Sequence, residues 1–374
     1  MDYNSEFRNA CSNGHLEVAK QLVCSYPQIN TSAANCAFRN ACSNGHLEVA
    51  KLLVESYPQI NVSFDDDRVF RDACEYGHLE VARWLVKSYS QINISARDDY
   101  AFIFACMFGH IEVTKWLVES YPQINISAQD DFAFRYACAK GHLEVARWLV
   151  ELYPQINISA NDNDAFRGAC ANGHLDIAKW LVGSYPQINI STRDDYAFRY
   201  ACANGQLEVA KWLVESYPQI NISDWDDFAF RGACAKGHLK VAKWLVESYP
   251  QINVYAFDYY AFIFACSNGY LEVAKWLVES YLKINISARD NHAFRAACWK
   301  GHLDIAKWLV EIRPYHYMIE LDPSQPRILN WRIRPIQETR WLERAVPILA
   351  YNSKTPNVFQ MLNYDTMRYI CKFV

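Results

Sequence analysis

Hydrophobic and polar positions along the chain repeat at one fixed spacing, and glycine marks the register. Ten glycines lie 31 residues apart once and 32 apart eight times: Gly14, Gly45, Gly77, Gly109, Gly141, Gly173, Gly205, Gly237, Gly269 and Gly301. Self-similarity at such a period is typical of stacked arrays. The pattern predicts ten copies of one unit over residues 1–311 and a different segment over residues 312–374.

The first half of each unit predicts a short helix. In the fifth unit, Phe134, Ala137 and Cys138 form one apolar stripe at helical spacing. Asp or Asn stands ten residues before the glycine in nine units, as Asp131 does, and we interpret it as the helix N-cap. The glycine then ends the helix because it tolerates positive φ.

The second half predicts a longer helix, such as residues 143–153, with Leu143, Ala146, Leu149 and Val150 at helical spacing. Trp stands seven residues after the glycine in eight units. Packing between successive helices explains this Trp better than a ligand contact does. A Tyr-Pro pair closes the helix. The β-branched segment after it predicts a hairpin-like loop to the next unit.

These units resemble the ankyrin repeat. Its second-helix signature Gly-His-Leu-Glu-Val-Val-Lys-Leu-Leu-Leu is matched by Gly141-His-Leu-Glu-Val-Ala-Arg-Trp-Leu-Val, and the end of its hairpin by Pro154-Gln-Ile-Asn157. The first helix departs, because Thr-Pro-Leu-His-x-Ala-Ala becomes Phe132-Ala-Phe-Arg-Tyr-Ala-Cys138. The resemblance implies an all-α ankyrin-repeat solenoid. It would have about ten stacked helix–turn–helix units with projecting β-hairpin loops, plus a short C-terminal cap.

The sequence of these repeats also resembles one group within the ankyrin-repeat proteins. The motif Ala-Phe-Arg-x-Ala-Cys in near-identical tandem copies resembles the ankyrin proteins encoded by giant DNA viruses of amoebae. That resemblance implies that the partner is a host protein.

Composition and charge restrict the partners further. The array over residues 1–311 has 28 basic and 36 acidic residues, which makes nucleic acid a poor partner. Charged residues interrupt every apolar run well before the ~18–20 residues that a membrane span needs. The first ten residues have no basic start and no apolar core, so no secretory signal is expected. We expect an intracellular protein of the cytoplasm or nucleus.

The recurring Cys and His residues are candidates for metal or catalytic chemistry. Ten of thirteen cysteines recur once per unit, without the short-spaced pairs of a zinc site, so they are interpreted as buried and structural. His follows the glycine in eight units, where a hydrogen bond to backbone at the turn explains it better than catalysis. No phosphate loop, nucleophile elbow or confined carboxylate pair occurs. We therefore expect no enzyme, no cofactor and no metal.

Positions that differ among the copies indicate where a partner binds. The resemblance implies binding through the concave first-helix face and the loop tips. Aromatic residues at these positions are Tyr100, Phe104, Phe108, Phe132, Tyr136, Tyr196, Tyr200, Trp225, Phe228, Tyr260 and Phe264. Such a band suits protein recognition, although the rings could instead pack only on neighbouring first helices. Arg six residues before the glycine in eight units is expected to pair with Asp of adjacent tips, with an acidic ligand as the alternative.

The segment over residues 312–374 breaks the repeat and is expected to cap it. Residues 357–374 predict one amphipathic helix in which Leu362, Met367, Ile370 and Phe373 are spaced loosely like an F-box segment. Viral ankyrin proteins of the poxvirus type carry such a segment, which recruits a ubiquitin ligase. The alternative function is therefore that of a substrate adaptor that contacts a ubiquitin-ligase subunit through residues 357–374.

Overall fold

The structure, a computed structural model, describes residues 3–26 and 30–312. The predicted cap and the F-box-like segment at 357–374 lie outside these residues, apart from Ile312, with which the last helix ends. The chain divides into two compact units at Arg193 and Asp194.

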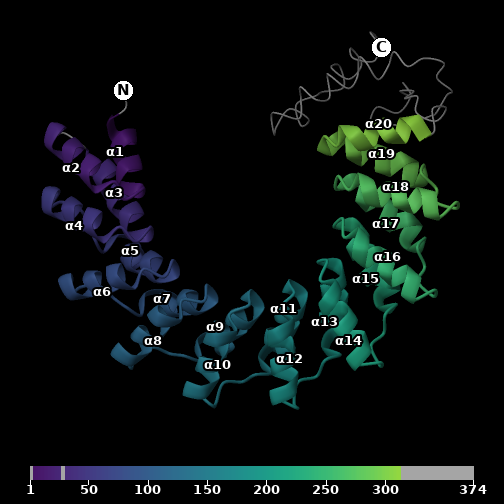
Figure 1. The fold of residues 1–374 in the computed structure, drawn as a ribbon, viewed down its shortest axis with the longest axis horizontal. Helices are drawn as coiled ribbons and strands as arrows, with labels where there is room; N and C mark the ends of the chain where they lie inside the picture. The colour runs from purple at the N-terminus through teal and green to yellow at the C-terminus, as the bar shows by residue number, and fades with distance from the viewer. Residues whose placement is uncertain (1–2, 27–29, 313–374) are drawn as a thin grey trace, which may run out of the picture. The chain divides into compact units, whose positions relative to one another are not determined.

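Every described repeat consists of two helices, as the pattern predicts (Figure 1). In the unit Met1–Arg193 the helices are α1 (Tyr3–Ser12), α2 (Leu16–Ser25), α3 (Thr31–Ser43), α4 (Leu47–Ser56), α5 (Phe64–Glu75), α6 (Leu79–Ser88), α7 (Ala96–Met107), α8 (Ile111–Ser120), α9 (Ala128–Lys140), α10 (Leu143–Leu152), α11 (Ala160–Asn172) and α12 (Leu175–Ser184).

The second unit begins at Asp194, inside α13. Its helices are α13 (Thr192–Ala203), α14 (Leu207–Ser216), α15 (Asp224–Ala235), α16 (Leu239–Ser248), α17 (Ala256–Ser267), α18 (Leu271–Ser280), α19 (Ala288–Lys300) and α20 (Leu303–Ile312). Odd-numbered helices are the first and even-numbered helices the second of each repeat. The 13 residues of α9 include three of positive φ near its start, so its right-handed part, over 132–140, is shorter than the 10 residues of α10, as expected.

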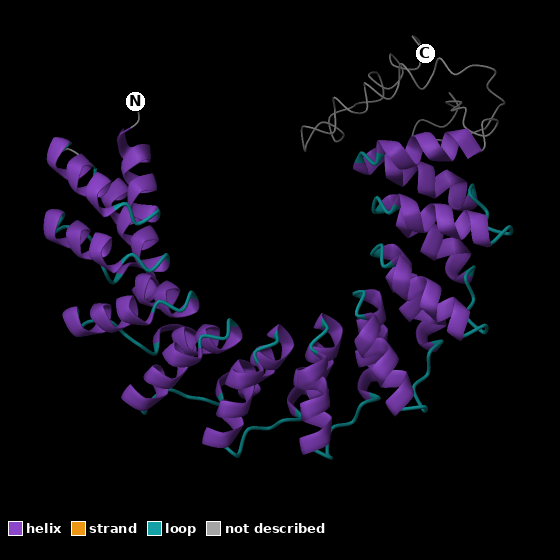
Figure 2. Ribbon diagram, viewed as in Figure 1, coloured by secondary structure: helices purple, strands orange, loops and turns teal. Residues whose placement is uncertain are grey.

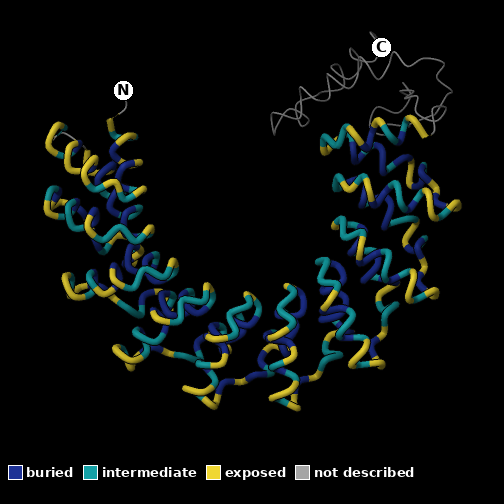
Figure 3. Tube along the Cα trace, viewed as in Figure 1, coloured by how far each residue is buried: buried dark blue, intermediate teal, exposed yellow. Residues whose placement is uncertain are grey.

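The core lies between the helices of neighbouring repeats (Figure 3). In α9, the predicted stripe of Phe134, Ala137 and Cys138 is at most 1% exposed. Each such stripe packs where consecutive first helices meet, as α7, α9 and α11 do in the first unit and α15, α17 and α19 in the second. From α10, Val145 and Ala146 are fully buried or nearly so. The first helices of the first unit lie on the inner side of its bend (Figure 1).

The recurring Trp packs between repeats, which confirms its structural interpretation. The Phe38 and Trp84 rings meet edge to face at 6.4 Å, and Phe70 meets Trp116 in the same way at 6.5 Å. In each pair the Phe comes from a first helix and the Trp from the second helix of the next repeat. Arg83 lies over the Trp116 ring from the preceding second helix, with its guanidinium carbon 5.8 Å from the ring centroid.

The loops between repeats are successive tight turns, and the described residues contain no strand (Figure 2). After α6, the amide of Ile92 donates to the carbonyl of Tyr89 at 3.2 Å. The side chain of Asn93 then accepts from the amide of Ser95 at 3.1 Å, which forms an Asx turn. The projecting loops therefore reverse the chain without the paired strands of a hairpin.

A left-handed turn opens the first helix of repeats three to ten. In α9 the residues Gln129, Asp130 and Asp131 have φ of 54–57°, and the right-handed helix begins only after them. Left-handed backbone costs most L-residues roughly 1–2 kcal/mol each, and Asp and Asn tolerate it best. This explains why the middle residue is Asp in all eight turns: Asp66, Asp98, Asp130, Asp162, Asp194, Asp226, Asp258 and Asp290.

The third residue of the turn was expected to be an N-cap, and this expectation is wrong for Asp131 and its equivalents. The Asp131 carboxylate accepts from the amide of Asn157 at 2.9 Å, so it ties the start of α9 to the loop after α10. Asp67 does the same with Asn93 at 2.8 Å. The reason is the left-handed turn, which directs the side chain away from the helix amides.

The second repeat shows what happens without this turn. It is the repeat with the 31-residue glycine spacing. Its helix α3 has no residue of positive φ, and Asn30 caps it by accepting from the amide of Ala33 at 2.8 Å. The repeats that have the left-handed turn are therefore one residue longer than the second repeat, which lacks it.

Candidate functional site

The His after each glycine joins neighbouring repeats. In the second repeat, Nε2 of His46 donates to the carbonyl of Ser12 at 3.0 Å, and His78 does the same with Ser43. The ring lies so close to the glycine of the preceding repeat that a Cβ built on Gly14 would come 2.5 Å from Nδ1 of His46. The predicted hydrogen bond to backbone is confirmed, and its acceptor belongs to the preceding repeat.

Burial shifts the pKa of several of the repeated His and Cys side chains. Desolvation lowers the pKa of His78, His110 and His142 below the usual value, which keeps their rings neutral. Burial raises the pKa of the Cys11 and Cys298 thiols to about 12. A thiol with so high a pKa is a poor nucleophile and a poor metal ligand at neutral pH. The described residues contain no cluster of three or more His, Cys, Asp or Glu side chains suited to a metal ion.

The Arg six residues before the glycine binds the left-handed turn of its own repeat. In α9, Nε of Arg135 donates to the carbonyl of Asp130 at 2.8 Å and Nη2 donates to that of Gln129 at 3.0 Å. Five arginines make the Nε contact at 2.6–2.9 Å: Arg71, Arg135, Arg167, Arg199 and Arg231. We call them the clamp arginines. The turn carbonyls were not predicted as the main partners of these arginines, because a left-handed turn cannot be recognised from the sequence.

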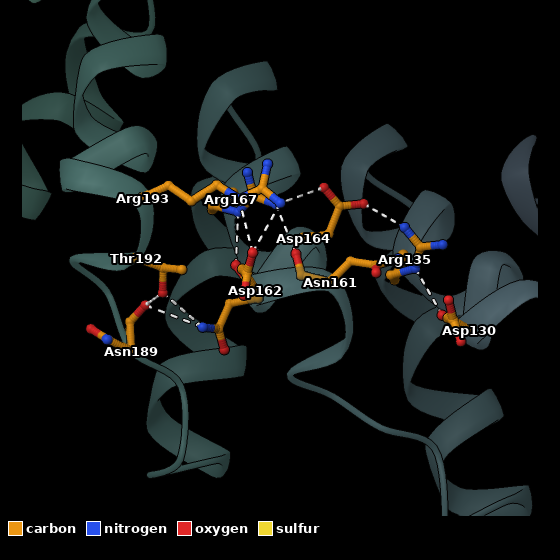
Figure 4. Close-up of polar contacts among 10 residues, drawn as sticks. Asp130, Arg135, Asn161, Asp162, Asp164, Arg167, Asn189, Thr192 and Arg193 are labelled. Atoms are coloured by element: carbon orange, nitrogen blue, oxygen red, sulfur yellow. Dashed lines mark hydrogen bonds and ion pairs between the residues drawn. The ribbon is translucent and has the colours of Figure 1, made fainter.

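Some clamp arginines also contact Asp side chains. Asp164 lies between two of them, with Oδ2 2.7 Å from Nη1 of Arg135 and Oδ1 3.3 Å from Nη2 of Arg167 (Figure 4). The predicted pairing with adjacent tips applies to Arg199, whose Nε lies 3.7 Å from Oδ2 of Asp224. Other arginines, at the tips themselves, link successive tips more directly, as Arg97 does with Asp65 at 2.6 Å.

The aromatic residues of the first helices form stacked pairs. Because the two variable positions are four residues apart, their side chains meet on one helix face. The centroids of Tyr100 and Phe104 are 3.8 Å apart, and those of the other three pairs are each 4.0 Å apart: Phe132 and Tyr136, Tyr196 and Tyr200, Tyr260 and Phe264. All eight rings are partly exposed.

These pairs also contact the neighbouring repeat. The Tyr100 hydroxyl donates to the Glu75 carboxylate at 3.0 Å, and burial together with this bond raises the pKa of Tyr100 to about 12. In the second unit, Tyr200 lies 5.3 Å from Phe228 of the next first helix. The rings therefore pack on neighbouring first helices, as the alternative interpretation expected, and still keep part of their surface open.

The remaining predicted rings lie at the ends of the first helices. Phe108 follows α7 and is 41% exposed, and Trp225 in the turn that opens α15 is 59% exposed. The guanidinium of Arg199 lies 4.5 Å from the centre of the Trp225 ring and 5.4 Å from that of Phe228. Phe257, 51% exposed in the next turn, lies 4.4 Å from the guanidinium of Arg231. From the sequence, these arginines were expected mainly as partners of Asp, although an aromatic residue follows each at a fixed distance in the next repeat.

Each unit has such rings and guanidinium groups on its first helices. Partly exposed rings and guanidinium groups, held by rigid helices, offer apolar area with a few directed hydrogen bonds, which is typical of protein-recognition hot spots. No described helix is both long enough and apolar enough to cross a membrane.

Comparison with known proteins gives one consistent family. A family model described as ankyrin repeats in three copies matches residues 7–98, 166–258 and 230–318, and one described as ankyrin repeats in many copies matches residues 134–182. Among solved structures, the human ASB11 ankyrin repeat domain is similar at 18% identity and a TM-score of 0.38, over 50% of this chain and 86% of that chain. No curated protein sequence matches the chain.

Proposed function

The chain belongs to the ankyrin-repeat family, and from this premise we propose that it is a non-enzymatic scaffold for protein–protein interaction. The partner protein binds the first-helix face and the loop tips. The observation that carries this proposal is the set of stacked, partly exposed ring pairs on α7, α9, α13 and α17. A partner that covers the open part of these rings buries apolar surface that already has a fixed geometry, so little side-chain entropy is lost on binding.

The binding face is tested by removing one ring pair without disturbing the core. In Tyr196→Ser/Tyr200→Ser, two partly exposed rings are lost from α13 while the buried stripe of Phe198 and Cys202 remains. Affinity purification with mass spectrometry from an amoebal lysate is expected to lose discrete partners for this variant.

The matched control is Leu282→Ser, because Leu282 is an apolar residue that is 96% exposed directly after the second helix α18, outside the first helices and the left-handed turns that open them. It is expected to keep the partners. If both variants lose the same partners, or if neither loses any, the proposal that the partner binds this face is contradicted.

The partner is a host-cell protein and the site of action is the cytoplasm or nucleus, if the resemblance to giant-virus ankyrin proteins holds. What supports this part of the proposal is the motif Ala-Phe-Arg-x-Ala-Cys in near-identical copies. Capture of the same amoebal protein from infected and uninfected cells would support a host partner, and capture of viral proteins alone would contradict it.

A second proposal is that the chain is a substrate adaptor for a ubiquitin ligase. It rests on the spacing of Leu362, Met367, Ile370 and Phe373 in the C-terminal segment. A variant that ends at Glu311 is expected to lose ligase subunits and to keep the substrate bound by the array. If both chains purify the same partner without ligase subunits, the adaptor role is wrong and the scaffold role stands.

A further inference from the structure

Arg231 differs from the other clamp arginines in one respect, its accessibility. Arg71, Arg135, Arg167 and Arg199 are 3–8% exposed, whereas Arg231 is partly exposed. Nε and Nη2 of Arg231 donate to the carbonyls of Asp226 and Trp225, both at 2.7 Å, so the side chain is fixed in place. Its remaining nitrogen, Nη1, has no hydrogen-bond or ion-pair partner among the residues that the structure describes.

The fifth repeat shows what that nitrogen binds elsewhere in the chain. There, Nη1 of Arg135 lies 2.7 Å from the carboxylate of Asp164, which stands nine residues before the glycine of the next repeat (Figure 4). In the repeat after Arg231, the same position is Tyr260. Within this chain, Nη1 of a clamp arginine therefore binds a carboxylate at Arg135. At Arg231 a tyrosine stands where that carboxylate would be.

Aromatic rings surround the same guanidinium. Its central carbon lies 4.4 Å from the centre of the Phe257 ring and 5.0 Å from that of Tyr260. Phe257 is 51% exposed, and Trp225 precedes it by one repeat with 59% exposure. Rings against a guanidinium hold its plane and exclude water from it, which strengthens a charge-assisted hydrogen bond made at its edge.

From these contacts we infer that Arg231, Phe257 and Tyr260 form a site for a carboxylate side chain of the partner protein. This inference rests on the proposed scaffold function and specifies the partner's chemistry. A phosphate would meet more repulsion, since it carries nearly two charges and the exposed Asp226 and Asp258 lie in the two adjoining turns. Arg71 offers no second site of this kind, because it is only 3% exposed beneath Tyr100.

The test uses the full chain and short random peptides displayed on phage. Peptides selected on the chain are expected to need one Asp or Glu, whose replacement by Asn or Gln weakens binding about tenfold or more, as loss of a hydrogen bond to a charged group does. The decisive variant is Tyr260→Asp, which places a carboxylate beside Arg231 as Asp164 stands beside Arg135. On this variant the acidic peptide and its amide form are expected to bind equally weakly.

The matched control is His292→Asp. His292 has the same register one repeat later, and the preceding repeat has Ile263 where a clamp arginine would stand. The ratio between acidic and amide peptides is expected to persist on this variant. Urea unfolding of each variant shows that it is folded.

The inference is overturned if the selected peptides do not depend on a carboxylate, or if that dependence persists on Tyr260→Asp. Peptides that lose binding on Tyr196→Ser/Tyr200→Ser but ignore the carboxylate change overturn this inference alone and leave the proposed scaffold function intact.

Discussion

In the eight repeats with a left-handed turn, single side chains stabilise backbone that is otherwise unfavourable. Asp at the middle position tolerates positive φ, and five of these repeats have a clamp arginine that binds the turn carbonyls. Repeats four and nine have Ile103 and Ile263 at the clamp position, and both are buried. An apolar residue therefore fits this position, so the clamp adds stability to a turn that forms without it.

Removal of one clamp arginine is expected to destabilise the array measurably. Arg135→Ala leaves two turn carbonyls without their donor and removes one of the two arginine partners of Asp164, which costs about 2 kcal/mol or more of unfolding free energy. The matched control is Arg39→Ala, in the repeat that has no left-handed turn, where the loss should stay below about 1 kcal/mol. Urea unfolding followed by circular dichroism measures both, and equal losses would contradict the clamp role.

The neutral histidines are expected to make stability depend on pH. The folded state lowers the pKa of His78, His142 and His238 by burial, so the unfolded chain binds more protons below its own pKa of about 6.5. Stability is therefore fully present above about pH 6.5 and declines as the pH falls below it. Urea midpoints between pH 7.5 and 5.5 measure this.

The seventh repeat supplies the control for this pH dependence, since Gln206 stands there in place of His. His142→Gln should reduce the loss of stability on acidification. If the slope is the same with and without this substitution, the junction histidines do not set the pH dependence.

Among the elements, the turn between the two helices of a repeat leaves no room for a side chain at its glycine. Gly141 has φ of 92°, and a Cβ there would lie 2.6 Å from Nδ1 and Cε1 of His174 in the next repeat. Gly183, inside α12, has an open position with no heavy atom within 4 Å of a Cβ. The same substitution should therefore have opposite effects at these two glycines.

Gly141→Ala is expected to lower the unfolding free energy by more than about 1 kcal/mol, because backbone strain and the clash add together. Gly183→Ala is expected to raise it by about 0.5–1 kcal/mol, since Ala is the better helix former. Thermal unfolding of the two variants distinguishes these outcomes. Two shifts of the same sign would refute this account of the junction.

The two helices of each repeat could be predicted from periodicity, because Phe, Ala and Cys recur on one face and glycine ends each first helix. The start of the first helix could not. Asp131 at that position is typical of an N-cap, yet the backbone there is left-handed. Asp is common both at N-caps and at left-handed positions, so the local sequence does not distinguish them. The rings of the candidate site were visible as variable positions, whereas Arg231 looked like its buried equivalents because its exposure depends on the next repeat.

For the molecule as a whole, neighbouring repeats meet in the same way wherever the His of one repeat packs against the glycine of the repeat before it. Gly14 faces His46, Gly45 faces His78, and at one junction Gly237 faces Tyr270 instead. In such arrays stability is nearly a sum of repeat and neighbour contributions. Removal of one whole repeat is therefore expected to leave a folded protein.

Deletion of residues 110–141 tests this expectation, because it places His142 directly after Gly109 and lets that glycine face His174. Circular dichroism should show helix content reduced by about the share of one repeat, with cooperative unfolding retained. Deletion of residues 110–125, half of that length, is the control and should unfold the junction. A whole-repeat deletion that fails to fold would show that the junctions are not equivalent.

The equivalence of the His–glycine junctions has a consequence for inheritance. Unequal crossing-over between two near-identical repeats joins the first part of one to the last part of another, and the product keeps the reading frame and a matching glycine and histidine at the new boundary. A gene built in this way can lengthen or shorten by whole repeats in one generation without passing through an unfoldable intermediate. Selection can then act on the number and order of ring-bearing repeats.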